Sequence, residues 1–140
     1  MIYRPLNPIE AEEAFRIENE NLSTAWSIDQ IKSLPNYATY IGAFEGESLC
    51  GVGSMYIIAD EAQILNLAVD KKHRKQGIGL GIMQFLIEKA KNSGVTVITL
   101  EVAFDNNSAI SLYEKCGFRS VGVRKGFYAG RDAIAMLKEL

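Results

Sequence analysis

A short basic, glycine-containing segment offers the best-defined chemistry in the chain. It reads Arg74, Lys75, Gln76, Gly77, Ile78, Gly79, Leu80. An apolar run at 64–69 precedes it and an amphipathic run at 80–91 follows, which predicts a strand, a loop and a helix in that order. Glycine lets the backbone approach a ligand closely, and a helix start presents unpaired N–H groups and the positive end of its dipole. The segment therefore predicts a cradle for a phosphate-like anion.

The basic residues around this cradle stand out against a weakly acidic chain. The 140 residues carry a formal net charge of −2, which argues against direct nucleic-acid binding. Lys71, Lys72 and His73 nevertheless lead directly into Arg74 and Lys75. A solvated turn is one explanation. Beside a glycine loop we favour the other, an electrostatic collar for a phosphorylated cofactor.

Composition excludes several other classes of protein. The two cysteines, Cys50 and Cys116, lie far apart and the chain has one histidine, so we expect neither a metal site nor a Ser-His-Asp triad. Both thiols are expected to be small buried groups. The glutamate-rich N-terminus is unlike a signal or transit peptide, and no apolar run is long enough to span a membrane. We expect a cytoplasmic protein that does not bind membranes.

The sequence pattern predicts one α/β domain spanning residues 1–140, with a mixed, mostly antiparallel central sheet flanked by helices. Strands are expected at 2–4, 37–44, 49–59, 62–69, 95–102, 121–123 and 133–137. Helices are expected at 8–21, from 28 to just before Pro35, at 78–91 and at 107–115. Residues 95–102 are mostly apolar, which predicts a central strand covered on both faces, and residues 126–131 are expected to form a loop.

Two familiar phosphate-binding motifs fit the glycine loop poorly. A dinucleotide fingerprint needs a third glycine where the chain has Ile82, and Gly81 comes one residue too early. A Walker loop needs Gly-Lys-Ser/Thr, which the chain lacks.

The chain instead resembles the GNAT superfamily of acyl-CoA N-acyltransferases. Within it, the likeness is greatest to the ribosomal-protein-alanine (RimI-type) and N-terminal acetyltransferases. The motifs that carry the resemblance are Arg74-x-x-Gly77-x-Gly79 and the segments 25–27, 66–69, 100–102, 106, 109–110, 112–114, 117–118 and 128–136. They cover nearly the whole chain. The resemblance implies the GNAT fold and acetyl transfer from acetyl-CoA to an amine, without a metal.

The resemblance also assigns residues to the cofactor. Backbone groups of the 67–69 segment would bind the pantetheine and the acetyl oxygen, and those of 75–80 the pyrophosphate. The expected cofactor-binding residues are Leu67, Ala68, Val69, Arg74, Lys75, Gln76, Gly77, Ile78, Gly79, Leu80 and Asn106. Asn106 is also placed to cap the helix at 107–115, and both roles are compatible.

Two residues are the catalytic candidates. The resemblance implies that Glu101 is the base, acting through a water, and that the Tyr113 hydroxyl is the general acid for the CoA sulfur. The alternatives are an exposed, inert carboxylate at a strand end and an ordinary core aromatic. We favour the catalytic roles, because a lone charge in an apolar strand needs a reason and the motif around Tyr113 matches.

Trp26 and Tyr128 are the candidates for binding the acceptor, although Trp26 could equally only staple the helix that follows. We expect the acceptor to be a protein or peptide N-terminus, because an α-amine has a pKa of about 7.7–8.0, against about 10.4 for lysine. The alternatives are a small amine, such as a polyamine or aminoglycoside, and a catalytically silent CoA-binding module. Residues 103–106 depart from the Arg-x-Ser-Asn usual in the group, which bears on the acceptor and not on the CoA site.

Overall fold

The computed structural model of the chain describes residues 1–128 and 130–140, with the side chain of Tyr128 outside that description. The strands are β1 (Ile2–Pro5), β2 (Ala38–Glu45), β3 (Ser48–Ile58), β4 (Glu61–Val69), β5 (Val97–Ala103), β6 (Arg119–Tyr128) and β7 (Arg131–Glu139). The helices are α1 (Ala11–Asn21), α2 (Ile28–Lys32), α3 (Ile78–Asn92) and α4 (Asn107–Lys115), with 3-10 turns η1 (Pro8–Glu10) and η2 (Lys71–His73). None of the described helices is long and apolar enough to cross a membrane.

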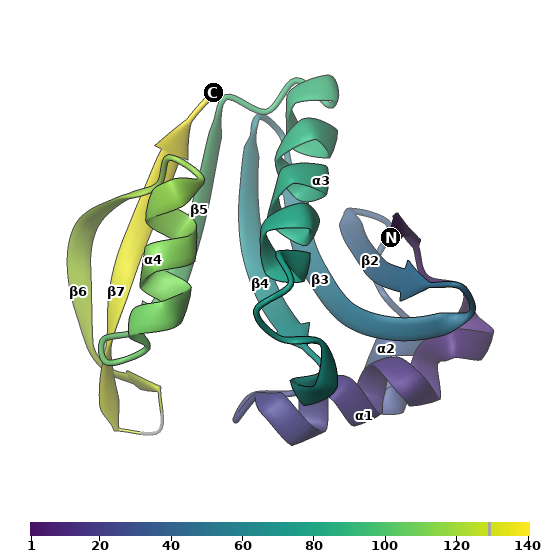
Figure 1. Cartoon of the computed structure of the whole chain (residues 1–140). Helices are drawn as coiled ribbons and strands as arrows, with labels where there is room; N and C mark the ends of the chain where they lie inside the picture. Colours follow the sequence, from purple (N-terminus) through teal and green to yellow (C-terminus); the bar gives the residue numbers. More distant parts are fainter. Residues whose placement is uncertain (129) are drawn as a thin grey trace.

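The strands form one sheet in the order β1-β2-β3-β4-β5-β7-β6 (Figure 1). Every pair of neighbours is antiparallel except β4 and β5, which are parallel. The predicted fold class, a mixed and mostly antiparallel α/β sheet, is confirmed. The parallel pair is also where the sheet opens, because β4 and β5 pair over three residues at one end, 61–63 against 97–99.

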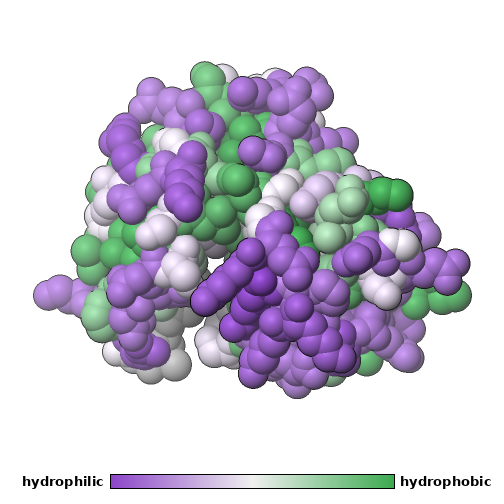
Figure 2. All heavy atoms as spheres, viewed as in Figure 1, coloured by the Kyte–Doolittle hydropathy of each residue, from purple (hydrophilic) through white to green (hydrophobic). Residues whose placement is uncertain are grey.

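Helices cover both faces of the sheet, and each face has its own core. On one face α3 and α4 pack over buried residues that include Ile82, Leu86, Ile98 and Leu100. On the other face, α1 and α2 pack over a smaller core around Ile17, Ile31, Tyr40, Phe44 and Val52. Hydrophilic residues gather over α1 on the outer surface, and the molecule is hollowed between this region and the β6–β7 end (Figure 2).

The helix starts follow the predicted capping pattern. The Glu10 carboxylate accepts a hydrogen bond from the Asn7 N–H at 2.8 Å. Ser27 and Gln30 bond reciprocally, each side chain to the other's backbone N–H, at 3.1 and 2.8 Å. Such reciprocal bonds satisfy N–H groups that a helix start leaves unpaired, which explains why the boundaries were predictable from local sequence.

Two expectations are wrong. The loop expected at 126–131 is too long at both ends, because β6 continues to Tyr128 and β7 already begins at Arg131. The strand at 95–102 is not covered equally on its two faces: Ile98, Leu100 and Val102 are buried, while the alternate positions are only half-buried. Glu101 lies on that more open face, and this places it beside the opening in the sheet.

Candidate active site

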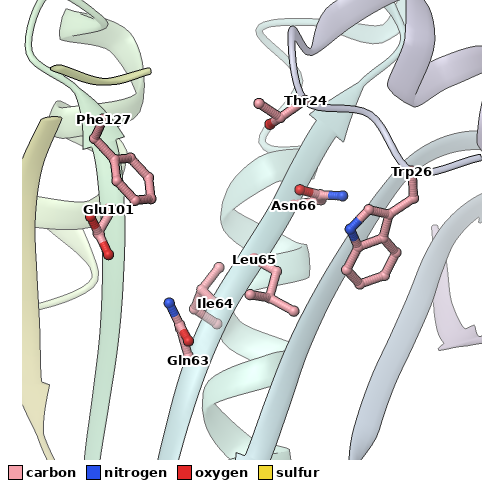
Figure 3. A pocket seen from close by; sticks show the side chains of 8 residues that line it. All are labelled: Thr24, Trp26, Gln63, Ile64, Leu65, Asn66, Glu101 and Phe127. Atoms are coloured by element: carbon pink, nitrogen blue, oxygen red, sulfur yellow. The ribbon is translucent and has the colours of Figure 1, made fainter. Parts of the chain in front are cut away.

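A cavity of about 260 Å³ lies where β4 and β5 separate. Figure 3 shows Glu101 and Phe127 on one side and Trp26, Thr24 and Asn66 on the other. Its full lining is Thr24, Trp26, Gln63, Ile64, Leu65, Asn66, Glu101 and Phe127. The cavity thus brings together two predicted site residues, Glu101 and Trp26, that are 75 positions apart in the chain.

A bulge in β4 accounts for the separation of the strands. Met55 of β3 pairs with Ile64 and Gly53 pairs with Leu67, so two residues of β4 stand opposite the single Ser54. The Ser54 hydroxyl accepts the N–H of Asn66 at 3.1 Å in place of a ladder bond. A bulge bends its strand and re-aims the side chains that follow. Beyond it, the described residues of β4 no longer pair with β5, which leaves the 67–69 edge facing the opening.

Glu101 is mostly buried and paired with a cation from the sheet edge. Arg124 of β6 donates to Glu101 Oε1 at 2.7 Å, and the Glu101 side chain is 14% exposed. The guanidinium of Arg124 also lies 4.5 Å from the ring centroid of Phe127. The carboxylate is therefore not exposed, as the alternative supposed, and its catalytic role stays a prediction.

Trp26 lines the cavity and is also held firmly by its neighbours. Its ring centroid lies 5.9 Å from that of Tyr40 and 6.2 Å from that of Tyr56, on which it stacks. Its backbone N–H donates to Glu18 Oε1 at 3.0 Å. Trp26 thus lines the cavity and is held by its neighbours, and its role in binding the acceptor stays a prediction. Tyr128, the other predicted acceptor residue, has its side chain outside the described part of the chain.

Glu18 is a buried carboxylate that the sequence did not single out. It is fully buried and accepts hydrogen bonds from the Trp26 N–H, from Asn66 Nδ2 at 2.9 Å and from the Tyr40 hydroxyl. Burial raises the pKa of the Glu18 carboxyl, and the three donors oppose that rise. Glu18 thus joins α1, the loop before α2 and β4 at the wall of the cavity.

We expect Glu18→Ala to destabilise the protein by about 3 kcal/mol, because it leaves buried donors of Trp26, Tyr40 and Asn66 without their acceptor. Urea unfolding measures the change. Glu18→Gln is the matched control, since its amide keeps an oxygen for the Trp26 and Asn66 donors. A loss in Glu18→Gln as large as in Glu18→Ala would contradict the hydrogen-bonding explanation.

The raised pKa of Glu18 also predicts that stability depends on pH. The pKa of Glu18 is higher in the folded state than its ordinary value of 4.5, so folding favours the protonated form. Its contribution is complete below pH 4.5 and is lost as pH rises through the folded pKa. The stability of wild type relative to Glu18→Gln should therefore fall as pH rises from 4.5 through that interval.

The predicted phosphate loop has the backbone of an anion cradle. Lys75 and Gly77 both have positive φ, 63° and 79°, and Gly77 is the N-cap of α3. Residues 74–77 are exposed, and the first N–H groups of a 15-residue helix follow them. The Arg74 guanidinium is engaged elsewhere, donating to the Asn21 side chain at the end of α1.

α4 lies beside this loop. A Cβ on Gly79 would lie 3.3 Å from Leu112 of α4, so the start of α3 and the middle of α4 are neighbours. Asn106 caps α4 by accepting the Ala109 N–H at 3.2 Å, as predicted. Tyr113 of α4 is buried in the core that α3 and α4 cover, and its ring centroid lies 6.2 Å from that of Phe118. It is not among the residues that line the cavity containing Glu101.

Comparison with known proteins identifies the family. The model of the acetyltransferase (GNAT) family matches residues 5–118. The chain belongs to this family. It is an N-acetyltransferase, and its co-substrate is acetyl-CoA.

The acetyltransferase is similar in sequence and structure to several proteins that are named as acetyltransferases. A Bacillus subtilis protein, provisionally named a [ribosomal protein bS18]-alanine N-acetyltransferase, is 31% identical over 89% of this chain and 86% of its own. The Escherichia coli enzyme of that name is 37% identical over 54% of this chain and 51% of its own. The crystal structure of the E. coli enzyme superposes with a TM-score of 0.90 at 28% identity, covering 99% of this chain and 92% of that one.

A further solved structure shows the same fold with the cofactor bound. It is a B. subtilis acetyltransferase in complex with CoA, with a TM-score of 0.80 at 23% identity, covering 98% of this chain and 95% of that one.

Proposed function

We propose that the protein transfers the acetyl group of acetyl-CoA to the α-amino group of a protein or peptide N-terminus in the cytoplasm. The observation that carries this proposal is the composition of the cavity between β4 and β5 (Figure 3). Trp26, Leu65 and Phe127 offer apolar surface for a first side chain, and Thr24 and the side-chain oxygen of Asn66 offer hydrogen bonds to a peptide backbone. The E. coli relative is named for acting on an alanine of ribosomal protein bS18, and this name supports the same acceptor class.

In the proposed reaction Glu101 and Tyr113 act from opposite faces of the sheet. The amine attacks the thioester carbonyl while its proton passes to Glu101 through a water. The C–S bond then breaks, and the hydroxyl of Tyr113 gives a proton to the leaving thiolate. Backbone groups of the 67–69 edge, left open by the bulge, would orient the pantetheine and stabilise the carbonyl oxygen. The N–H groups of residues 75–80 and the Asn106 side chain would hold the rest of the cofactor.

A small polycationic acceptor fits this cavity less well. Among the described lining residues Glu101 is the single carboxylate, and Arg124 already pairs with it. The nearby carboxylate of Glu18 is turned inward to three donors. A polyamine or aminoglycoside carries several positive charges and needs more negative charge than this to bind well. A silent CoA-binding module would have no need for a mostly buried Glu101 at the cavity.

We expect peptides beginning with Ala or Ser to be acetylated at neutral pH and polyamines to be poor acceptors. The reason is that an α-amine with a pKa of about 7.7–8.0 is partly neutral at pH 7, whereas amines near 10.4 are not. The measurement is acetylation by mass spectrometry from pH 6 to 9, with Ala-, Ser- and Met-starting peptides and polyamines as acceptors. Peptides with a blocked N-terminus and an internal lysine are the control. Efficient turnover of polyamines without turnover of peptides would contradict the proposal.

The same assay tests the base. Glu101→Gln should depress peptide acetylation most at low pH, where the amine most needs help to lose its proton. Acetyl-CoA binding, measured in parallel, should be unchanged, because Glu101 faces the acceptor side of the opening. A uniform loss of rate across the pH range would instead indicate a positioning role for the carboxylate.

A further inference from the structure

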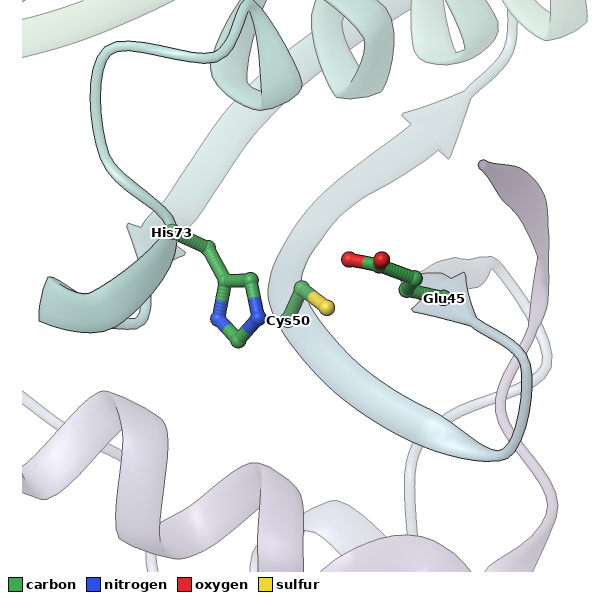
Figure 4. Close-up of side chains that lie close together, drawn as sticks. All are labelled: Glu45, Cys50 and His73. Atoms are coloured by element: carbon green, nitrogen blue, oxygen red, sulfur yellow. The ribbon is translucent and has the colours of Figure 1, made fainter.

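Three potential metal ligands meet at the entrance to the cofactor loop, away from the cavity that contains Glu101. They are Glu45 at the end of β2, Cys50 in β3 and His73 at the end of η2. One ligand atom from each lies within 4.8 Å of the other two. Figure 4 shows the three side chains converging from separate segments.

The β2–β3 hairpin and its bulge position two of these side chains. Glu45 and Ser48 close the β2–β3 hairpin, and Phe44 pairs with Leu49 while Ala43 pairs with Gly51. Cys50 is therefore the extra residue of a bulge, a feature that re-aims side chains. Asp70, which follows β4, links β3 to η2 by hydrogen bonds.

Asp70 makes that connection through its backbone. Its N–H donates to the Cys50 carbonyl at 2.8 Å, and its own carbonyl accepts the His73 N–H at 2.8 Å. The Asp70 side chain also caps η2 at the Lys72 N–H, at 3.4 Å. The positions of Cys50 and His73 relative to each other are thus fixed by hydrogen bonds and not by chance proximity.

The ring of His73 presents one nitrogen to the cluster. Figure 4 shows Nε2 facing Cys50, while Nδ1 lies on the far side of the ring, where it is buried and has no hydrogen-bond partner among the described residues. Cys50 is fully buried, and its thiol donates to the Ser48 carbonyl at 3.5 Å, an ordinary distance for sulfur. Buried polar atoms are normally paired, so the unpaired Nδ1 of His73 departs from what a protein interior usually allows.

The chemistry of the three groups selects the ion. A thiolate, an imidazole and a carboxylate are the donors that zinc accepts, at about 2.0–2.3 Å and in a tetrahedral arrangement with room for a water. Magnesium and calcium prefer oxygen ligands alone. Glu45 is exposed, so its side chain is free to rotate inward and close the distances. The two anionic ligands would neutralise the charge of the ion.

We propose that Glu45, Cys50 and His73 form a binding site for a zinc ion. An approach to it exists, since His73 also lines a second cavity of about 390 Å³ beside Glu13, Glu47 and Asp70. His73 directly precedes the phosphate loop at 74–79. A bound zinc ion therefore stabilises η2 and the start of the loop. From the sequence we expected no metal site, because these ligands come from three segments with no motif spacing.

Zinc binding to the intact protein tests the proposal. After dialysis against a chelator, titration calorimetry should give one zinc ion per chain, and zinc should raise the melting temperature, whereas magnesium should do neither. His73→Gln should weaken zinc binding by at least about 10–100-fold and remove the thermal shift. Glu45→Gln should weaken it less, because a water is able to replace the carboxylate.

The other cysteine provides the matched control. Cys116 is half-buried in a different part of the core, so Cys116→Ser should bind zinc like wild type and Cys50→Ser should not. Cys50→Ser removes a fully buried group and its folding is at risk. If Cys50→Ser folds poorly, the zinc affinity of His73→Gln, on a surface turn, decides the test. The proposal is overturned if wild type does not bind one zinc ion per chain. It is also overturned if His73→Gln and Cys116→Ser bind zinc equally.

Discussion

Gly77→Asp is expected to weaken acetyl-CoA binding at least about 100-fold, which corresponds to about 2.8 kcal/mol. Gly77 is the N-cap of α3, where the unpaired N–H groups and the positive end of the helix dipole favour an anion. An aspartate there places a carboxylate where the pyrophosphate is expected to lie. Titration calorimetry with acetyl-CoA measures the loss, and circular dichroism checks that the fold is retained.

Backbone strain has to be separated from this charge effect, because Gly77 has a φ of 79° that other residues rarely adopt. Gly94 is the matched control: its φ is 80°, and a Cβ at either glycine meets no other atom within 4 Å. Gly94 follows the opposite end of α3. Gly94→Asp should therefore impose the same backbone strain as Gly77→Asp and leave acetyl-CoA binding intact. Unchanged affinity in Gly77→Asp would contradict the cradle, and equal losses in both variants would assign the effect to strain.

The elements that the sequence predicted well are those that local interactions determine. The capping boxes at Asn7–Glu10 and Ser27–Gln30 depend on residues three positions apart, and both are present. The strand, glycine turn and helix from β4 to α3 were predictable for the same reason, since they are consecutive in the chain. Gly81, which disagreed with a dinucleotide motif, has a packing role instead: a Cβ there would overlap the hydroxyl of Tyr3.

The elements that were missed depend on partners distant in sequence. The bulge of β4 at residues 65–66 exists because Ser54 of β3 lies opposite, and nothing in residues 61–69 alone reveals it. β6 was predicted too short because it is an edge strand whose described side chains from 121 to 127 are all exposed. Such a strand lacks the alternation of buried and exposed residues from which strands are inferred.

Glu18 was overlooked because a glutamate in a helix is usually taken as part of the solvated face. Its position carries a signal, however: Ala11, Ala14 and Ile17 are buried, and Glu18 follows Ala11 by seven residues and Ala14 by four. Residues at this spacing share one face of a helix. A carboxylate on the buried face predicts a hydrogen-bonded network, although its partners Tyr40 and Asn66 could not be named from the sequence.

Tyr113→Phe is expected to reduce kcat by about 10²–10⁴-fold, the usual contribution of a general acid. The substitution removes one hydroxyl from a residue that is 8% exposed, so the ring keeps its packing against Phe118 and acetyl-CoA affinity should be preserved. The loss should appear in kcat rather than in KM for acetyl-CoA, because the hydroxyl acts on the departing sulfur in the transition state. Steady-state kinetics with the best N-terminal peptide, together with calorimetry for acetyl-CoA, measures both quantities.

The comparison with another tyrosine decides whether the hydroxyl of Tyr113 is special. Tyr3 of β1 packs its hydroxyl against α3 at Gly81, so Tyr3→Phe also removes a hydroxyl at the same core without touching α4. We expect Tyr3→Phe to leave kcat within about twofold of wild type, since substitutions outside the reacting groups change the barrier little. An unchanged kcat in Tyr113→Phe, measured where chemistry limits the rate, would make Tyr113 a core aromatic. Equal losses in both variants would trace the effect to packing around α3, and the acid would then have to be sought elsewhere.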